Sequence, residues 1–174
     1  MPPDELCPTC RRRIVPSDGA AFVDGHIVHV PCYVGDGDQA HDGAGSRDIL
    51  VGVHVLVVED SDATREMLQA ALEYCGAFVS TASCAREAKA IVREVRPHVI
   101  VSDVAMPDNG FDVVRDVLAF AVETGLMIPA VAITEARVAR DHVKDAGFSA
   151  FITKPLDPLM LAVVVERLAR ARPS

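Results

Sequence analysis

From Ile49 onwards, short apolar runs alternate five times with amphipathic segments whose apolar residues follow helical spacing. The runs are rich in valine, isoleucine and alanine, which is typical of strands buried on both faces. Such an alternation predicts a parallel sheet with helices on both faces, because each parallel connection needs a crossover helix. The expected strands are 53–58, 78–81, 99–103, 128–134 and 148–153.

The amphipathic segments carry the start signals of helices. Asp62 and Ser83 suit the N-caps of the first two helices. Asp157 opens the last helix, because Pro158 fits the first helical turn, where its missing N–H is not needed. The expected helices are 62–75, 83–95, 111–122, 136–146 and one that starts at 157.

Polar residues stand at the carboxyl ends of four of the five expected strands. In chain order they are Glu59, Asp60, Asp103, Thr134 and Lys154. Parallel strands bring these ends to one sheet edge, where ligands of open α/β sheets bind. Three carboxylates there repel each other unless a divalent cation lies among them, while a lysine and a hydroxyl suit phosphoryl oxygens. The pattern predicts a phosphoryl-transfer site with a nucleophilic carboxylate, although Asp103 alone is equally consistent with a solvated acid that opens a loop.

These residues resemble the response-regulator receiver domain of two-component signalling. The motifs are VLVVED at 55–60, VSDVAMP at 101–107, AIT at 132–134 and ITKP at 152–155. The resemblance covers about residues 53–171 and implies a flavodoxin-like, doubly wound sheet in the order 2-1-3-4-5. It also implies a phosphorelay function, in which Asp103 accepts a phosphoryl group from a histidine kinase or a phosphotransfer protein.

The resemblance implies a magnesium site around Asp103. Asp60 would bind Mg²⁺ directly and Glu59 through water. Asp103 and the backbone carbonyl of Ala105 would complete the protein ligands.

The resemblance also implies a switch on the neighbouring strands. Lys154 would pair with the phosphoryl oxygens, and Thr134 would move to hydrogen-bond the acyl phosphate. Phe151 stands at the position of an aromatic switch that turns inward as Thr134 moves; it is equally consistent with an ordinary edge aromatic. Two departures from the family pattern bear on donor access: the loop 106–110 is one residue shorter, and Glu135 replaces a small residue.

The N-terminal residues carry a second pattern, C-x2-C at Cys7 and Cys10 and H-x2-C at His29 and Cys32. Two close pairs separated by residues 11–28 have the spacing of a tetrahedral zinc site, and a metal would stabilise a segment too short for its own core. The pattern resembles the first half of a LIM-type zinc finger. His26 is a competing ligand, and a tail with reduced thiols or a disulfide is the plainer alternative.

The division of the chain follows from these patterns. We expect a zinc-binding β module at 1–34, built from hairpins over 12–15, 21–23 and 26–28. A linker rich in glycine and aspartate at 35–50 would join it to the receiver domain at 51–174.

Composition excludes several functions. A formal net charge of −8 argues against binding nucleic acid through a basic surface. The chain has no apolar run near the roughly 20 residues of a membrane span and no signal-peptide pattern at its N-terminus. We therefore expect a cytoplasmic, reducing location, where clustered cysteines are typical of metal sites.

The sequence stops with its last expected helix, so we expect no DNA-binding or enzymatic output domain. Output would pass by protein contact to an unknown downstream partner, with a phosphorylation-dependent dimer as a further candidate. The main alternative is a zinc-dependent adaptor or scaffold whose degenerate receiver is not phosphorylated. A haloacid-dehalogenase-type enzyme is disfavoured, because Ala105 stands where that class has a second acid.

Overall fold

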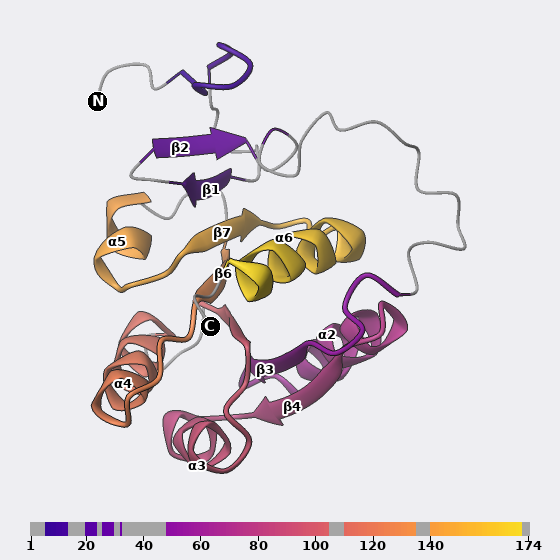
Figure 1. Cartoon of the computed structure of the whole chain (residues 1–174), viewed down its shortest axis with the longest axis vertical. Coiled ribbons are helices and arrows are strands. Elements are labelled where there is room, and N and C mark those ends of the chain that lie inside the picture. The colour runs from indigo at the N-terminus through magenta and orange to yellow at the C-terminus, as the bar shows by residue number, and fades with distance from the viewer. Residues whose placement is uncertain are drawn as a thin grey trace.

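The computed structural model describes residues 6–13, 20–23, 26–29, 32, 48–104, 110–134 and 140–171. One seven-stranded sheet lies at its centre (Figure 1). In spatial order the strands are β2 (His26–His29), β1 (Ala20–Val23), β7 (Ala150–Thr153), β6 (Ala130–Thr134), β5 (Val99–Asp103), β3 (His54–Val58) and β4 (Phe78–Ala82).

The five strands β4, β3, β5, β6 and β7 are parallel, in the order predicted from the sequence. Every residue of β5, β6 and β7 is buried, as expected of strands covered on both faces. The register places Asp103 beside Ile133, and Thr134 beside Thr153. The carboxyl ends of β5, β6 and β7 therefore meet at one edge.

Helices flank the sheet in pairs: α2 contacts α6, and α3 contacts α4 (Figure 1). The helices are α2 (Asp62–Tyr74), α3 (Ala85–Val95), α4 (Gly110–Glu123), α5 (Arg140–Asp145) and α6 (Pro158–Arg170). The doubly wound architecture is thereby confirmed. Among the described residues, no helix is long and apolar enough to cross a membrane.

Two of the three expected N-caps lie one residue away from their predicted positions. Ser61 caps α2 with its hydroxyl, and Asp62 is the first helical residue, where it forms an ion pair with Arg65. Cys84 is the N-cap of α3, but its side chain makes no capping bond. Asp157 caps α6 as predicted, its Oδ1 accepting from the N–H groups of two residues in the first turn at 2.9 and 3.3 Å.

The start of α4 packs directly against the end of β5. A Cβ on Gly110 would lie 2.7 Å from the carbonyl oxygen of Asp103 and 2.8 Å from the Cα of Val104. Only a residue without a side chain fits there, so the helix begins in contact with the backbone that carries Asp103.

The N-terminal hairpin departs from the predicted domain division. The sequence predicts a module held by a flexible linker, but β1 pairs antiparallel with β7 and extends the receiver sheet. The physical reason is that β7 would otherwise end the parallel sheet and leave a row of unpaired N–H and C=O groups. The other expected hairpin, between 12–15 and 21–23, is not formed by the described residues, where Arg13 instead makes a bridge with Leu6 and β1 pairs with β2 and β7. The predicted linker lies mostly outside the described residues.

Candidate functional site

Asp103 and Lys154 meet at the carboxyl edge of the sheet. Lys154 Nζ lies 2.5 Å from Asp103 Oδ2, and the Asp103 side chain is 7% exposed. The Lys154 N–H donates to the carbonyl oxygen of Thr134 at 2.8 Å, so the loop after β7 is tied to the end of β6. A buried carboxylate is thus paired with a partly exposed cation that can also reach a ligand.

Thr134 lies on β6, the strand beside β5, and Phe151 lies on β7, the next strand outward. Both are buried: Thr134 ends β6, and Phe151 is the register partner of Ala132 on that strand. The structure brings both residues to the same part of the sheet as Lys154, while the switch roles assigned to them stay predictions.

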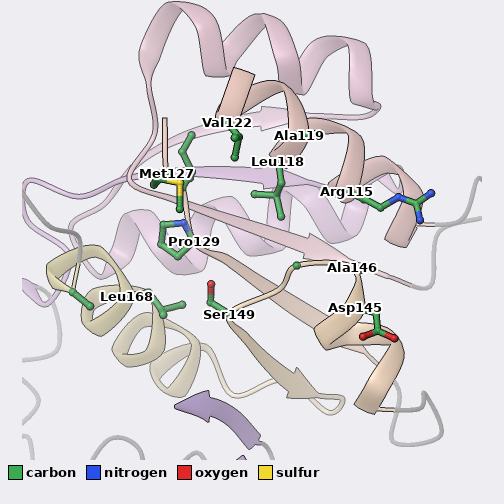
Figure 2. A pocket seen from close by; sticks show the side chains of 13 residues that line it. Arg115, Leu118, Ala119, Val122, Met127, Pro129, Asp145, Ala146, Ser149 and Leu168 are labelled. Carbon is green, nitrogen blue, oxygen red and sulfur yellow. The ribbon is translucent and has the colours of Figure 1, made fainter. Parts of the chain in front are cut away.

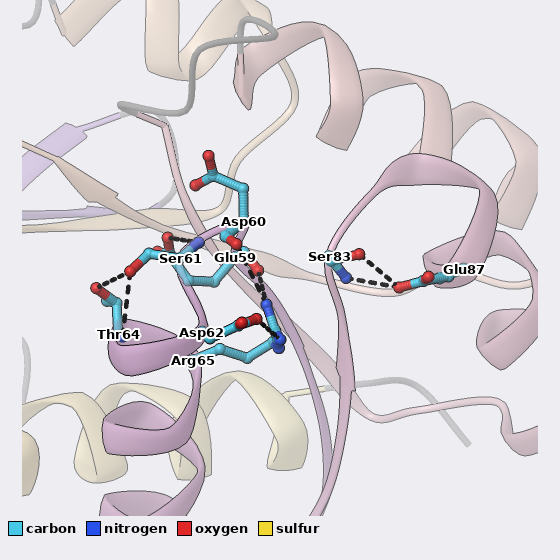
Figure 3. Close-up of polar contacts among 8 residues, drawn as sticks. All are labelled: Glu59, Asp60, Ser61, Asp62, Thr64, Arg65, Ser83 and Glu87. Carbon is cyan, nitrogen blue, oxygen red and sulfur yellow. Dashed lines mark hydrogen bonds and ion pairs between the residues drawn. The ribbon is translucent and has the colours of Figure 1, made fainter.

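Glu59 is the second buried acid of this edge. It is 3% exposed, and its Oε1 accepts a 3.0 Å hydrogen bond from the Ser61 N–H (Figure 3). Among the described residues, its Oε2 is the buried side-chain oxygen that lacks a hydrogen-bond partner. Burial is the main cause that raises the pKa of Glu59 to about 7, and the charges of Asp103 and Asp60 add to it. The hydrogen bond from the Ser61 N–H lowers this pKa but does not outweigh them. A cation would satisfy this oxygen.

The acids at this edge fit Mg²⁺, a hard cation that prefers carboxylate oxygens. Glu59 and Asp103 are buried, whereas Asp60 is exposed, and Figure 3 shows its carboxylate directed away from Arg65. These three residues would hold the ion. Ala105, the loop 106–109 and Glu135 lie outside the described residues.

Arg65 is a site residue that the sequence analysis did not single out. Its Nη1 donates to the backbone carbonyls of Glu59 at 2.9 Å and Asp60 at 3.4 Å, and its Nη2 forms an ion pair with Asp62 Oδ1 (Figure 3). The side chain therefore fixes the loop that carries both acids. The available signal was an arginine three residues after the helix-opening aspartate.

The four predicted N-terminal ligands converge. The side-chain ligand atoms of Cys7, Cys10, His29 and Cys32 all lie within 4.8 Å of one another. His29 Nδ1 is 3.3 Å from Cys10 Sγ and 4.0 Å from Cys32 Sγ. His29 Nε2 lies 3.2 Å from the Arg13 carbonyl oxygen, which suits an Nε2–H donor and makes Nδ1 the ring nitrogen that can bind a metal. The alternative ligand His26 is at the other end of β2.

The electrostatics of this cluster suit a soft divalent cation. Burial raises the pKa of the Cys7 thiol, but backbone hydrogen bonds from Cys10 and His29 outweigh it and lower the value to about 6. Burial and the neighbouring thiols of Cys10 and Cys7 raise the pKa of Cys32 to about 12. Three thiolates therefore cannot share the site alone, and three sulfurs with one imidazole match the ligands that Zn²⁺ takes in structural sites.

The molecule also has a largely apolar cavity of about 560 Å³, shown in Figure 2. Leu118, Met127 and Leu168 are among the residues that line it, between α4, α6 and the start of β6. It lies at the amino end of β6, about 15 Å from the edge that carries Thr134, since each strand residue rises about 3.3 Å. The cavity is therefore separate from the site at Asp103.

Comparison with known proteins identifies the parallel part of the chain. The sequence profile of the response regulator receiver domain matches residues 55–166. An uncharacterised 14.6 kDa protein of Leptolyngbya boryana is 37% identical over 129 residues, which cover 71% of this chain and 95% of that protein. Response regulator MprA of Mycolicibacterium vanbaalenii is 35% identical over 69% of this chain, but the match spans only 49% of MprA.

Solved structures of receiver proteins also match the parallel part of the chain. The chemotaxis protein CheY4 of Vibrio cholerae aligns with a TM-score of 0.59 at 30% identity, over 67% of this chain and 98% of CheY4. Receiver domains generally bind Mg²⁺ and interact with histidine kinases or phosphotransfer proteins. The sheet order, the paired Asp103 and Lys154 and these matches lead to one conclusion: the chain belongs to the response regulator receiver domain family.

Proposed function

We propose that this chain is a response regulator whose Asp103 accepts a phosphoryl group from a histidine kinase or a phosphotransfer protein. The observation that carries the proposal is the buried Asp103 carboxylate, 2.5 Å from Lys154 Nζ, at the edge that also holds the unsatisfied oxygen of Glu59. The ion pair argues against the alternative of a scaffold with a degenerate receiver, because the acceptor carboxylate and the lysine that would pair with the phosphoryl oxygens are both in place.

The residues of this edge would divide the transfer between them. An oxygen of Asp103 forms a bond to phosphorus as the phosphorus–nitrogen bond of the donor breaks. The electron pair of the broken bond stays on the histidine nitrogen of the donor. Lys154 then pairs with the phosphoryl oxygens in place of the Asp103 carboxylate. The Thr134 hydroxyl donates a hydrogen bond to an oxygen of the acyl phosphate. Glu59, Asp60 and Asp103 would hold Mg²⁺, which would supply positive charge against the phosphoryl oxygens.

Phosphorylation would change contacts of this protein with other proteins. We propose that Phe151 turns as Thr134 moves and that this alters the surface of α5 beside the ends of β6 and β7, where a downstream protein or a second phosphorylated chain binds. We propose that the reaction of this chain is its own phosphorylation, and that nucleic acid is not a partner, in keeping with the net charge of −8. The cytoplasmic location stays a prediction.

Zn²⁺ is the second proposed cofactor, held by Cys7, Cys10, His29 and Cys32. The convergence of their ligand atoms within 4.8 Å and the His29 to Arg13 contact support it. Freshly purified chain should contain about one zinc per molecule, measured by elemental analysis. A Cys7→Ser, Cys10→Ser variant should contain none, and an absence of zinc from the unaltered chain would refute this assignment.

Incubation with acetyl phosphate and Mg²⁺, followed by intact mass measurement, tests the phosphorylation. We expect the mass of one phosphoryl group in the unaltered chain and in Asp116→Asn, a control on the exposed surface of α4. Asp103→Asn should gain none. If the unaltered chain gains no mass, the proposal is wrong and the scaffold alternative takes its place.

A further inference from the structure

The hairpin places the metal cluster and the phosphoryl site on one continuous stretch of paired backbone. Ala20 of β1 has two register partners: His29 on β2 and Phe151 on β7. His29 contributes Nδ1 to the cluster, and Phe151 is buried on the strand that leads to Lys154. A single row of three residues therefore crosses from the metal ligand to the functional strand.

The strand β7 continues this row to Asp103. It ends at Thr153, and the next residue, Lys154, contacts Asp103 Oδ2 and donates its N–H to the Thr134 carbonyl. The position of β7 therefore sets the position of Lys154. Anything that holds or releases the outer edge of β7 acts on the cation that faces the phosphoryl acceptor.

The hairpin needs support from both of its neighbours. Its strands have four residues each, and an isolated two-stranded hairpin of that size is marginal in water. One support is the backbone pairing with β7. The other is the cluster, which joins the end of β2 to the turn at Cys7–Cys10 and to Cys32. Because both supports hold the same hairpin, strengthening one strengthens the other.

We propose that Zn²⁺ binding at the Cys7, Cys10, His29 and Cys32 site and phosphorylation of Asp103 are coupled through the pairing of β1 with β7. With zinc bound, β1 stays on β7 and Lys154 is held where it pairs with the phosphoryl oxygens, so zinc stabilises the phosphorylated state and the chain also accepts a phosphoryl group more readily. By thermodynamic linkage, phosphorylation then raises the affinity for zinc by the factor by which zinc favours the phosphorylated state. The proposal rests on the proposed phosphorylation and makes the response conditional on the metal.

The reciprocal effect is the first test. The dissociation constant of Zn²⁺ is measured on the full chain by competition with a chromogenic chelator, before and after phosphorylation by acetyl phosphate and Mg²⁺. We expect zinc to bind at least about five-fold more tightly to the phosphorylated chain, the lower end of ordinary coupling between sites. Asp103→Asn, treated identically, should show no change. Equal affinities in the two states of the unaltered chain would overturn the proposal.

The rate of phosphorylation is the second test, in zinc-loaded chain and in chain stripped with a chelator that binds zinc but spares Mg²⁺. We expect the stripped chain and Cys7→Ser, Cys10→Ser to react several-fold more slowly. Cys84→Ser, a matched change at a partly exposed cysteine outside the cluster, should behave like the unaltered chain. Hydrogen exchange over residues 150–154 should be faster without zinc, while circular dichroism checks that the parallel sheet is still folded.

Proline substitutions in β1 test the route. Successive strand residues direct their N–H groups to opposite neighbours, so one of Ala20→Pro and Ala21→Pro removes a bond to β7 and the other a bond to β2. We expect at least one variant that still binds zinc but has lost the five-fold difference. If both keep it, the coupling does not run through the hairpin. If no condition yields phosphorylated protein, the proposed function itself fails, whereas equal phosphorylation with and without zinc refutes only the coupling.

Discussion

Glu59→Gln should make the metal-free protein more stable at alkaline pH. The change removes a charge but keeps the shape of the side chain and an oxygen that accepts the Ser61 N–H. Glu59 is 3% exposed, and burial together with the charges of Asp103 and Asp60 raises its pKa from 4.5 to about 7. The folded chain therefore holds this proton more tightly than the unfolded chain does.

The sign and size of the effect follow from that difference. As the pH rises from about 4.5 to about 7, the unfolded chain releases the proton first, so stability falls across this range and then levels off. The gap between the two values, at about 1.36 kcal/mol for each pH unit, gives a cost of about 3 kcal/mol at pH 8. At pH 5 the same linkage costs less than about 1 kcal/mol. Glu59→Gln should recover these amounts.

Urea unfolding at pH 5 and pH 8 measures the effect, in a buffer free of divalent ions and again with Mg²⁺. Bound Mg²⁺ compensates the charge of Glu59, so it should stabilise the unaltered chain most at pH 8 and Glu59→Gln far less. Glu66→Gln, at an exposed position of α2, is the matched control and should change little. If Glu59→Gln is no more stable than the unaltered chain at pH 8 without Mg²⁺, the pKa of Glu59 is not raised in the folded chain and the prediction is wrong.

Three further outcomes are expected. Lys154→Ala should destabilise the chain by several kcal/mol and slow its phosphorylation at least ten-fold, because it removes the cation that forms an ion pair with the buried Asp103 carboxylate; urea unfolding and intact mass report the two effects. Gly110→Ala should cost about 1–3 kcal/mol in urea unfolding although alanine favours helices, because its Cβ would meet the backbone of residues 103 and 104. The acyl phosphate should persist far beyond seconds when its decay is followed by mass, because Ala105 and Ala136 offer no polar group to position water.

The parallel half of the fold could be predicted because its physics is local in the sequence. Runs such as Val99–Val101 must be buried on both faces, and five of them separated by helices leave little choice of architecture. Strand ends then share an edge, which brought Asp103 and Lys154 together from positions 51 residues apart. The approach of four N-terminal ligands followed in the same way from spacing alone.

The remaining features depend on contacts between distant segments. The four residues of β1 do not indicate that the strand pairs with β7, because an edge strand offers the same backbone groups to any strand that reaches it. The helix start at Ser61 has a neighbour, Asp62, that is equally suited to a cap, and the start at Cys84 follows Ser83, which is better suited to one than the cysteine. The role of Arg65 depends on two carbonyls turned toward it, which side-chain patterns do not record.

The pairing of the hairpin with β7 also affects how shortened forms of this protein should behave. A chain shortened to begin at residue 48 would keep the whole parallel sheet. It would expose the outer backbone of Ala150 and Phe151, which pairs with β1 in the full chain. Two such pieces can align their bare strands and assemble side by side. Self-association seen only in the shortened protein would then report on the missing hairpin rather than on signalling.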